Sequence, residues 1–456
     1  MASTLARILA AALLGCSAAA SAATFTVNRT TDAWDGSCDA HCTLRDAVQA
    51  ANDAPGADVI QLAVTTYKLT LPPPVDSESN IGDEDENRNG DLDITGELTI
   101  KGHTGGTYVD GRGLTRIVEV LAGANVELRD LKLRNGNTPA RGGAVANAGT
   151  LRMVRVDARL NTASSSHDLG QGGAVFNDSA GILSIADSHF QLNRAGGGAA
   201  SHGEGGAVYN LGRLNVRTTG FVDNRSGDGE DVGGGGAIMN RVGFATIERC
   251  YFVRNSTMSE GQGGAIANRE SGRLRLANST VSANISGTLD TLGGAVANGT
   301  PFEVPGRMTL SFNTIAGNQG GGLFVAGEAT TAHNIIGGNY ERVGDARDYN
   351  AGSNCVVVGA VTDTGSVVGL DGNCPYRTGI LNHEIFTVLL RGLADNGGFG
   401  LTHALRRTSD HAIDRVAPFE ACPAVDQRGA PRPVDGDGRD EVGCDVGAYE
   451  VQVIDD

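Results

Sequence analysis

The sequence carries one dense run of acidic and amide side chains, Asp83–Asp93. Counted from Asp85, the first, third, fifth, sixth and ninth positions match an EF-hand-like calcium loop, in which side-chain oxygens bind the ion and a glycine makes the turn. The bidentate acid expected at the last ligand position is missing, because Gly96 stands there. Two interpretations stay open, a calcium site and a solvated acidic turn. The candidate ligands are Asp85, Asn87, Asn89, Asp91 and Asp93.

A second set of oxygen ligands lies near the C-terminus. Asp435 and Asp437 belong to an Asp-Gly-Asp-Gly turn, and Asp445 follows downstream. Carboxylates on a glycine turn are the ligands that calcium prefers. The alternative is a polar turn held by a disulfide. Calcium is the one cofactor that the sequence suggests.

The strongest pattern is an internal repeat of 28 to 33 residues. The motif Gly-Gly-Ala-(Val/Ile)-x-Asn occurs six times, and a second motif, apolar-x-x-Asn, lies between the copies. Apolar residues alternate with a period of two inside each unit, which predicts strands. Residues that recur once per unit predict coils stacked in register, with columns of asparagine amides that hydrogen-bond to one another and glycines that supply positive φ. The motif asparagines are Asn147, Asn177, Asn210, Asn240, Asn268 and Asn298.

These patterns predict an all-β fold, a right-handed parallel β-helix of about ten coils. We expect a targeting segment at 1–22, an N-terminal cap with the first coil at 23–75, the solenoid at 76–345 and a disulfide-containing C-terminal cap at 346–456.

The loops before each Gly-Gly-Ala motif should stack on one side of the solenoid, where repeat proteins usually bind their ligands. Their charged residues could hold calcium against a uronic-acid polymer or supply the carboxylate pair of a glycosidase. The other interpretation is a solvated loop surface. No hydrolase or phosphate-binding motif accompanies these loops, so the sequence assigns no catalytic residue. The candidate binding face is His167, Asp168, His202, Glu204, Asp228, Glu230, Asp231, Glu260 and Asp290.

The net charge limits the possible partners, and the first residues indicate the compartment. The formal net charge of −17 disfavours nucleic acid and anionic lipid as partners, and an acidic glycan would need bridging cations or clustered arginines. Residues 1–22 combine Arg7, an apolar stretch and the small residues Ala20–Ala22, which is typical of a signal peptide. A lipoprotein signal ending at Cys16 is the alternative. No other stretch is long and apolar enough to span a membrane, and we expect a monomer.

The other cysteines agree with export. Sequence proximity suggests the disulfides Cys38–Cys42, Cys355–Cys374 and Cys422–Cys444, although other pairings are possible. The first pair could instead form a metal clip, but an oxidising compartment favours a disulfide. Cys250 falls in a column of small polar residues, and we expect a buried, reduced filler rather than a reactive thiol.

Both ends of the chain resemble known modules of exported proteins. The run Cys42–Ala47 resembles the CSLREA domain of exported bacterial proteins, and here it predicts a short helix with a Thr43–Asp46 capping box that covers the open end of a solenoid. The segments Leu393–Gly398, Asp426–Gly429 and Cys444–Glu450 resemble the choice-of-anchor Q domain. The central repeats resemble those of polymorphic outer-membrane proteins and the pectin-lyase-like β-helix class. These resemblances imply residence at the cell surface or outside the cell, and they imply no general reaction.

The sequence therefore predicts an exported, non-catalytic β-helix protein of the cell surface or extracellular space, with adhesion or glycan binding as its function and a polysaccharide or cell-surface ligand as its partner. The alternative is a calcium-dependent polysaccharide lyase or glycoside hydrolase that uses the same fold.

Overall fold

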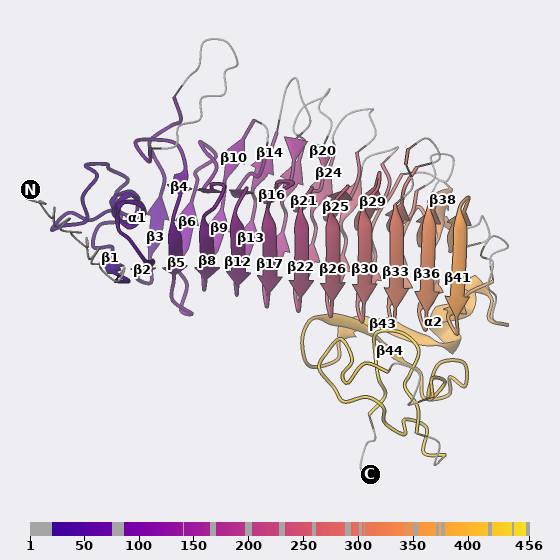
Figure 1. Cartoon of the computed structure of the whole chain (residues 1–456). Helices are drawn as coiled ribbons and strands as arrows, with labels where there is room; N and C mark the ends of the chain where they lie inside the picture. The colour runs from indigo at the N-terminus through magenta and orange to yellow at the C-terminus, as the bar shows by residue number, and fades with distance from the viewer. Residues whose placement is uncertain are drawn as a thin grey trace, which may run out of the picture.

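The computed structural model shows a solenoid of parallel strands, with a helix at its start and a small C-terminal region packed beside it (Figure 1). The predicted all-β parallel solenoid is confirmed. The structure describes residues 21–74, 86–139, 141–164, 170–196, 203–227, 233–257, 261–287, 293–300, 303–304, 306–343, 345–349, 354–370, 374, 379–417, 422–439 and 442–452.

Three long parallel sheets, named A, B and C here, form the walls of the solenoid, with 12, 11 and 10 strands in the described part of the chain. Sheet A holds β1 (Thr24–Thr26), β2 (Ala57–Gln61), β5 (Glu97–Lys101), β8 (Asn125–Arg129), β12 (Thr150–Val154), β17 (Ile182–Ala186), β22 (Arg213–Arg217), β26 (Phe244–Glu248), β30 (Arg273–Ala277), β33 (Arg307–Ser311), β36 (Glu328–Ala332) and β41 (Ala360–Thr364). Sheet B holds β3 (Thr66–Lys68), β6 (Tyr108–Asp110), β9 (Lys132–Arg134), β13 (Asp157–Arg159), β18 (His189–Gln191), β23 (Gly220–Val222), β27 (Tyr251–Val253), β31 (Thr280–Ser282), β34 (Thr314–Ala316), β37 (Ile335–Gly337) and β42 (Val367–Val368). Sheet C holds β4 (Leu92–Ile94), β7 (Val118–Val120), β11 (Val145–Asn147), β16 (Val175–Asn177), β21 (Val208–Asn210), β25 (Ile238–Arg241), β29 (Ile266–Arg269), β32 (Val296–Asn298), β35 (Leu323–Val325) and β40 (Cys355–Val357).

Shorter elements complete the fold. A narrow parallel sheet, sheet D, follows sheet B in each middle coil and holds β10 (Asn137–Thr138), β14 (Thr162–Ala163), β19 (Arg194–Ala195), β24 (Arg225–Ser226) and β28 (Ser256–Thr257). Three strand pairs stand apart: β15 (Gly170–Gln171) with β20 (Gly203–Glu204), β38 (Glu341–Val343) with β39 (Ala346–Asp348), and β43 (Leu390–Asp395) with β44 (Leu401–Leu405). The helices are α1 (Leu44–Asp53), η2 (Asn382–Glu384) and α2 (Ile385–Val388).

Alternating side chains explain how sheet A forms. In β17, Leu183 and Ile185 are buried, whereas Ile182 faces solvent. The register pairs equivalent positions of successive coils, so that Leu151, Leu183 and Leu214 lie side by side. Inward side chains therefore stack into one continuous core, and outward side chains form straight rows along the axis.

The apolar-x-x-Asn motif builds the core of sheet B and the corner that follows it. The rings of Phe190, Phe221 and Phe252 stack with centroids 5.2 and 4.8 Å apart. The asparagine three residues after each ring is buried at the turn into sheet D. One motif therefore supplies both an aromatic stack and a polar column.

Two columns of buried asparagines run along the solenoid. In the Gly-Gly-Ala column, from Asn147 to Asn298, each Nδ2 donates to the Oδ1 of the next coil at 2.6 to 2.7 Å. In the second column, from Asn161 to Asn382, the same bonds measure 2.9 to 3.0 Å. The predicted stacking of asparagine amides is confirmed, and it satisfies polar groups that would be costly to bury alone.

The glycines of the repeat are required by their positions. Gly172, the first glycine of its motif, adopts a φ of +67°. A Cβ on the next glycine, Gly173, would lie 2.1 Å from the carbonyl oxygen of Gly206 in the following coil. The first glycine therefore supplies the predicted positive φ, and the second allows the coils to approach closely.

Helix α1 covers the start of the solenoid. Thr43 and Asp46 form the predicted capping box, which is confirmed. The apolar face of the helix, with Leu44, Ala47 and Val48, is buried. The helix therefore shields the first coils from solvent, as predicted.

The cysteines pair as predicted. The disulfides Cys38–Cys42, Cys355–Cys374 and Cys422–Cys444 are present. Cys250 is buried and free, and burial raises the pKa of its thiol to about 12. Three disulfides are typical of a protein that folds in an oxidising compartment. In the described residues, no helix is long and apolar enough to cross a membrane.

The parallel ladders run past residue 345, where the repeat motif predicts the solenoid to end. Strands β40, β41 and β42 add one more strand to sheets C, A and B. The last coil has no Gly-Gly-Ala motif, which is why the sequence pattern stops short of it. Asn354 nevertheless continues the asparagine column there.

The C-terminal region, expected as an end cap, lies alongside the later coils against the outer face of sheet B (Figure 1). The Thr280 hydroxyl donates to Gln427 Oε1 at 2.6 Å, and the Ser282 hydroxyl lies 2.9 Å from His403 Nε2. The Gly447 amide donates to a main-chain carbonyl of the adjoining coil. The outward side chains of sheet B in these coils are uncharged, so this face can be covered at low desolvation cost.

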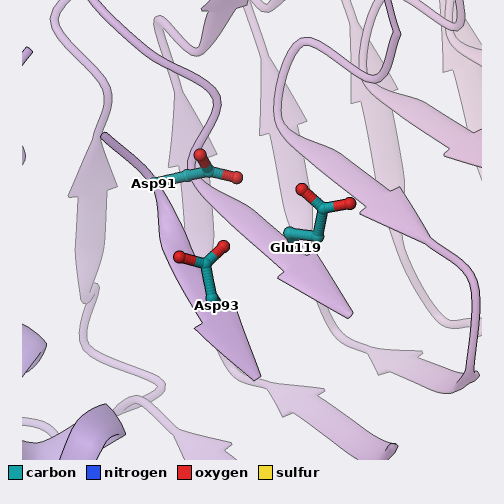
Figure 2. Close-up of side chains that lie close together, drawn as sticks. All are labelled: Asp91, Asp93 and Glu119. Carbon is teal, nitrogen blue, oxygen red and sulfur yellow. The ribbon is translucent and has the colours of Figure 1, made fainter. Parts of the chain in front are cut away.

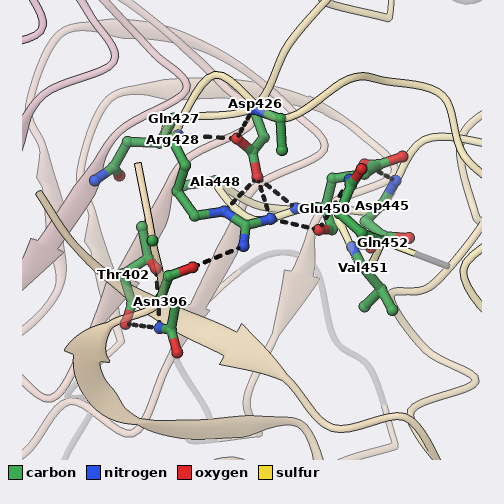
Figure 3. A network of polar contacts seen from close by, with 12 residues as sticks. Asn396, Thr402, Asp426, Gln427, Arg428, Asp445, Ala448, Glu450, Val451 and Gln452 are labelled. Carbon is green, nitrogen blue, oxygen red and sulfur yellow. Dashed lines mark hydrogen bonds and ion pairs between the residues drawn. The ribbon is translucent and has the colours of Figure 1, made fainter. Parts of the chain in front are cut away.

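A polar network organises the C-terminal region (Figure 3). The Arg428 guanidinium forms an ion pair with Asp426 at 2.7 Å and donates to the main-chain carbonyls of Asn396 and Glu450. It also lies 3.7 Å from the ring centre of Tyr449. One arginine therefore connects three segments of the C-terminal region.

The asparagine columns predict that replacing a buried asparagine lowers the free energy of unfolding far more than replacing an exposed one. Asn224→Ala removes the acceptor of Asn193 and the donor to Asn255, so we expect the free energy of unfolding to fall by about 2 to 4 kcal/mol. The control is Asn215→Ala, because Asn215 is exposed in the same coil. This substitution should change the free energy of unfolding by less than about 0.5 kcal/mol. Urea denaturation followed by circular dichroism measures both, and equal midpoints for the two variants would contradict the account.

Candidate functional site

The outer face of sheet B divides into two halves. From β23 onward its outward side chains are uncharged, and the C-terminal region covers this half. The outward side chains of the earlier strands, β3 to β13, include many charges. These are Lys68, Asp110, Lys132, Arg134, Asp157 and Arg159.

A hollow of about 770 Å³ lies where the charged half of sheet B adjoins sheet D. Its cationic lining residues are Lys68, Arg112, Arg134 and Arg194, and its carboxylate is Asp110. Polar side chains and glycines supply most of the remaining wall. The groove, as this hollow is called below, therefore concentrates positive charge on a chain whose net charge is −17.

Asp110 fixes the side chain of Arg134. Its carboxylate accepts from Arg134 Nε at 3.1 Å, from Asn135 Nδ2 at 3.0 Å and from the Arg112 amide at 2.9 Å. Burial acts to raise the pKa of Asp110, but these hydrogen bonds outweigh it and hold that pKa below its usual value. Asp110 therefore stays ionised at neutral pH and positions a guanidinium at the wall of the groove.

Arg194 stands at the other wall, on β19. It occupies the same row of sheet D as Arg225, one strand away. Burial lowers the pKa of Arg194, and the charge of Arg225 lowers it further. The two arginines hold paired positions on neighbouring strands, whose backbones lie about 4.8 Å apart, and two like charges so placed favour an anion nearby.

An aromatic ring adjoins the groove. The Tyr108 ring lies 4.5 Å from the Arg134 guanidinium carbon and 5.0 Å from Lys132 Nζ, measured from its centroid. Both cations therefore lie within reach of a cation–π contact with the same ring. This contact further restricts the orientation of Arg134.

The residues of the groove are better suited to binding an anion than to hydrolysing a glycosidic bond. Arginine forks bind carboxylate and sulfate groups through paired hydrogen bonds. Among the residues that line the groove, Asp110 is the one carboxylate, whereas a glycosidase needs two. The arrangement can therefore hold an anionic chain by its charged groups.

The predicted N-terminal calcium loop surrounds an arginine. The Arg45 side chain is fully buried, forms an ion pair with Asp32 at 2.9 Å, and donates to the carbonyls of Asn89, Gly90 and Asp91. Those carbonyls point at the Arg45 guanidinium. It therefore occupies the place that a calcium ion would take in such a loop. Sequence spacing alone does not reveal this, because Arg45 lies in α1.

The remaining candidate ligands of this run divide between two environments. Asn87 bonds through its side chain to the main chain of Asp93. Asp91 and Asp93 instead lie near Glu119, with one oxygen of each within 4.8 Å of the others (Figure 2). Arg116 pairs with both Asp91, at 2.6 Å, and Glu119. Three carboxylates suit calcium, but Arg116 already offsets part of their charge; Asp85 lies outside the described residues.

The C-terminal candidates also separate. Asp435 and Asp437 meet Asp414, again within 4.8 Å. Burial raises the pKa of Asp414, which accepts from the amides of Gly436 and Asp437. Asp445 is not part of this cluster, because its two oxygens accept from the amides of Asp414 and Val451.

Glu204 is the one residue of the predicted loop face that the structure describes. It is 3% exposed, and its carboxylate lies 3.2 Å from Arg241 and 3.4 Å from Arg269. Burial raises its pKa. It therefore joins β20 to sheet C instead of facing solvent. The other members, His167, Asp168, His202, Asp228, Glu230, Asp231, Glu260 and Asp290, lie outside the described residues.

The sequence analysis missed the groove. Lys68, Asp110 and Arg134 precede the first Gly-Gly-Ala motif, so their alignment in one row is not visible in the sequence. Arg194 joins them from a later coil, which carries both motifs. One signal is the choice of basic residue in this acidic chain, because only three of the 36 basic residues are lysines and the others are arginines.

The Asp91–Asp93–Glu119 cluster gives a prediction about metal binding. Arg116→Ala removes the cation that offsets these carboxylates, so we expect the free energy of unfolding to fall by about 2 to 4 kcal/mol. Added calcium should then raise the melting temperature of the variant more than that of the wild type. Arg88→Ala, from the exposed pair with Glu86, is the control. An equal calcium response in all three proteins would exclude a metal site here.

No family model matches this chain, and no curated protein matches it. Among solved structures, a pectate lyase, Pel9A, is similar at 13% identity and a TM-score of 0.46, over 95% of this chain and 97% of that one. A rhamnogalacturonan lyase is similar at 12% identity and a TM-score of 0.39, over 75% and 87%. An alginate lyase of family PL6, AlyGC, is similar at 12% identity and a TM-score of 0.36, over 90% of this chain and 59% of that one. At these values the likenesses assign neither an activity nor a substrate to this chain.

Proposed function

We propose that this protein binds an acidic polysaccharide in the groove, without cleaving it, and acts as an exported surface or extracellular protein. The observation that carries the proposal is the gathering of Lys68, Arg112, Arg134 and Arg194 around one hollow of a chain with net charge −17. Repulsion between an acidic polymer and the rest of the surface would confine binding to such a place.

The chemistry of the cations supports a carboxylated ligand. Three of the four are arginines, whose planar forks match carboxylates in two-point hydrogen bonds. Asp110 and Tyr108 hold Arg134 in place, so less side-chain entropy is lost on binding. A uronic-acid polymer offers one such carboxylate per sugar.

Export and surface residence belong to the same proposal. The three disulfides, the signal-like segment 1–22 and the resemblance of both ends to modules of exported proteins support them. Calcium, where it binds, would serve the stability of the two ends, because neither carboxylate cluster shares a residue with the groove.

Removing two groove arginines tests the proposal. Arg134→Ala combined with Arg194→Ala should weaken binding to polygalacturonate about tenfold or more at low salt, because two charge-assisted contacts are lost. Arg342→Ala, an exposed arginine on β38, is the control and should bind as the wild type does. Calorimetry at two salt concentrations measures the affinity, and wild-type affinity in the double variant would rule the groove out.

A second candidate function is cleavage by β-elimination. In that reaction a base takes the proton next to the uronate carboxylate, and the glycosidic oxygen leaves the neighbouring carbon. Arg194 lines the groove, where it would lie beside a bound uronate, so it is the side chain through which this candidate is tested.

The two candidates differ in their products. Wild-type protein is incubated with pectate, alginate and glycosaminoglycans, with and without calcium, and ultraviolet absorbance follows the unsaturated ends. We expect no absorbance change. Absorbance that grows with the wild type and disappears with Arg194→Ala would replace binding alone with a lyase.

A further inference from the structure

The outer face of sheet A carries a second group of arginines, over the neighbouring strands β22, β26, β30 and β33. All of them are exposed, and Glu248 is the one carboxylate among the outward side chains of these four strands. We call this surface the arginine face. It consists of Arg213, Arg217, Phe244, Arg273, Arg275 and Arg307.

The register arranges part of this surface into one row. Arg213, Phe244, Arg273 and Arg307 are direct partners in successive strands. Neighbouring strands lie about 4.8 Å apart, which is close to the length of one sugar residue in a chain. A polymer that runs along the solenoid would therefore meet a guanidinium or a ring at each step.

Phe244 is unusual in its exposure. It is 53% exposed and is the one large apolar residue among the outward side chains of these four strands, and the Arg273 guanidinium carbon lies 5.3 Å from its ring centre. A hollow of about 290 Å³ adjoins both side chains and Arg275. The ring offers an apolar surface for the CH face of a sugar, with cations beside it for the acidic group.

The charge of the arginine face is largely unopposed. Among the described residues, no carboxylate forms an ion pair with Arg213, Arg273 or Arg275. Arg307 pairs with Glu328 at 3.1 Å, but both side chains are mostly exposed, so the pair is weak. Elsewhere on the same sheet the pattern differs, because Arg152 and Arg129 share Glu127.

We propose that the arginine face binds a second chain of the acidic polysaccharide, so that one protein molecule bridges two polymer chains. The bridging rests on the proposed function of the groove, whereas binding at the arginine face does not. The groove lies on sheets B and D over the early coils, and the arginine face lies on sheet A over later coils. Two polysaccharide chains can therefore bind to one protein molecule without competing. A polymer network held at both sites is retained more strongly than a chain held at one site.

The first measurement uses a short galacturonate oligomer to count the binding sites on each protein molecule. Calorimetry should give two oligomers per wild-type molecule, and one for the triple variant Arg273→Ala, Arg275→Ala, Arg307→Ala. The control is Arg152→Ala with Arg155→Ala, two arginines already paired with Glu127 and Asp130, and it should retain both sites. All substituted side chains face outward, and an unchanged melting temperature confirms that each variant folds.

The second measurement tests bridging. Wild-type protein captured on immobilised polygalacturonate should retain a fluorescent, soluble polygalacturonate, and the triple variant should retain about tenfold less. The groove variant Arg134→Ala, Arg194→Ala separates the two proposals. If only the groove variant loses bridging, and the triple variant still binds two oligomers per molecule, the arginine face is refuted and the groove stands. If only the triple variant loses binding, the groove is refuted and the arginine face stands.

A competitor distinguishes the class of polymer. Binding at the arginine face should survive an excess of single-stranded DNA of equal charge, because the row lacks a series of stacking rings for bases. Complete displacement by this DNA at equal concentration would overturn the assignment to a polysaccharide.

Discussion

Successive coils of this solenoid lie in register because buried asparagines hydrogen-bond from each coil to the next, from Asn161 to Asn382 in one column and from Asn147 to Asn298 in another. A slip of one residue would break both columns and turn the core side chains outward. The register of the inner columns therefore also sets the register of the outer rows. Every surface feature discussed above is a consequence of that constraint.

The outer rows change character along the axis, and this change divides the surface. On sheet B, the rows bear Lys68, Asp110 and Arg134 over the early coils. Over the later coils they bear uncharged residues such as Thr280 and Ser282. The C-terminal region covers the uncharged part (Figure 1). The groove lies over the charged part. The C-terminal region and the groove therefore lie over different coils, as the charges of the outward side chains differ.

The repeat, the asparagine columns, the glycine turns, the capped helix and the disulfides could all be predicted, because each is a pattern of neighbouring or regularly spaced residues. The candidate site could not. Arg134 and Arg194 line one hollow although they lie far apart in the sequence and on different sheets. The acidic run shows the opposite difficulty, because its spacing resembles a calcium loop, yet Arg45 from a distant segment occupies its centre. Long-range partners decide both cases, and spacing along the chain does not contain them.

The central claim is that charge on the ligand holds it in the groove. The most direct measurement is calorimetry with polygalacturonate and with its fully methyl-esterified form at the same low salt concentration. The account predicts binding to the free acid and none to the ester, because esterification removes the charge and keeps the sugar chain. Equal affinity for the two polymers would contradict it.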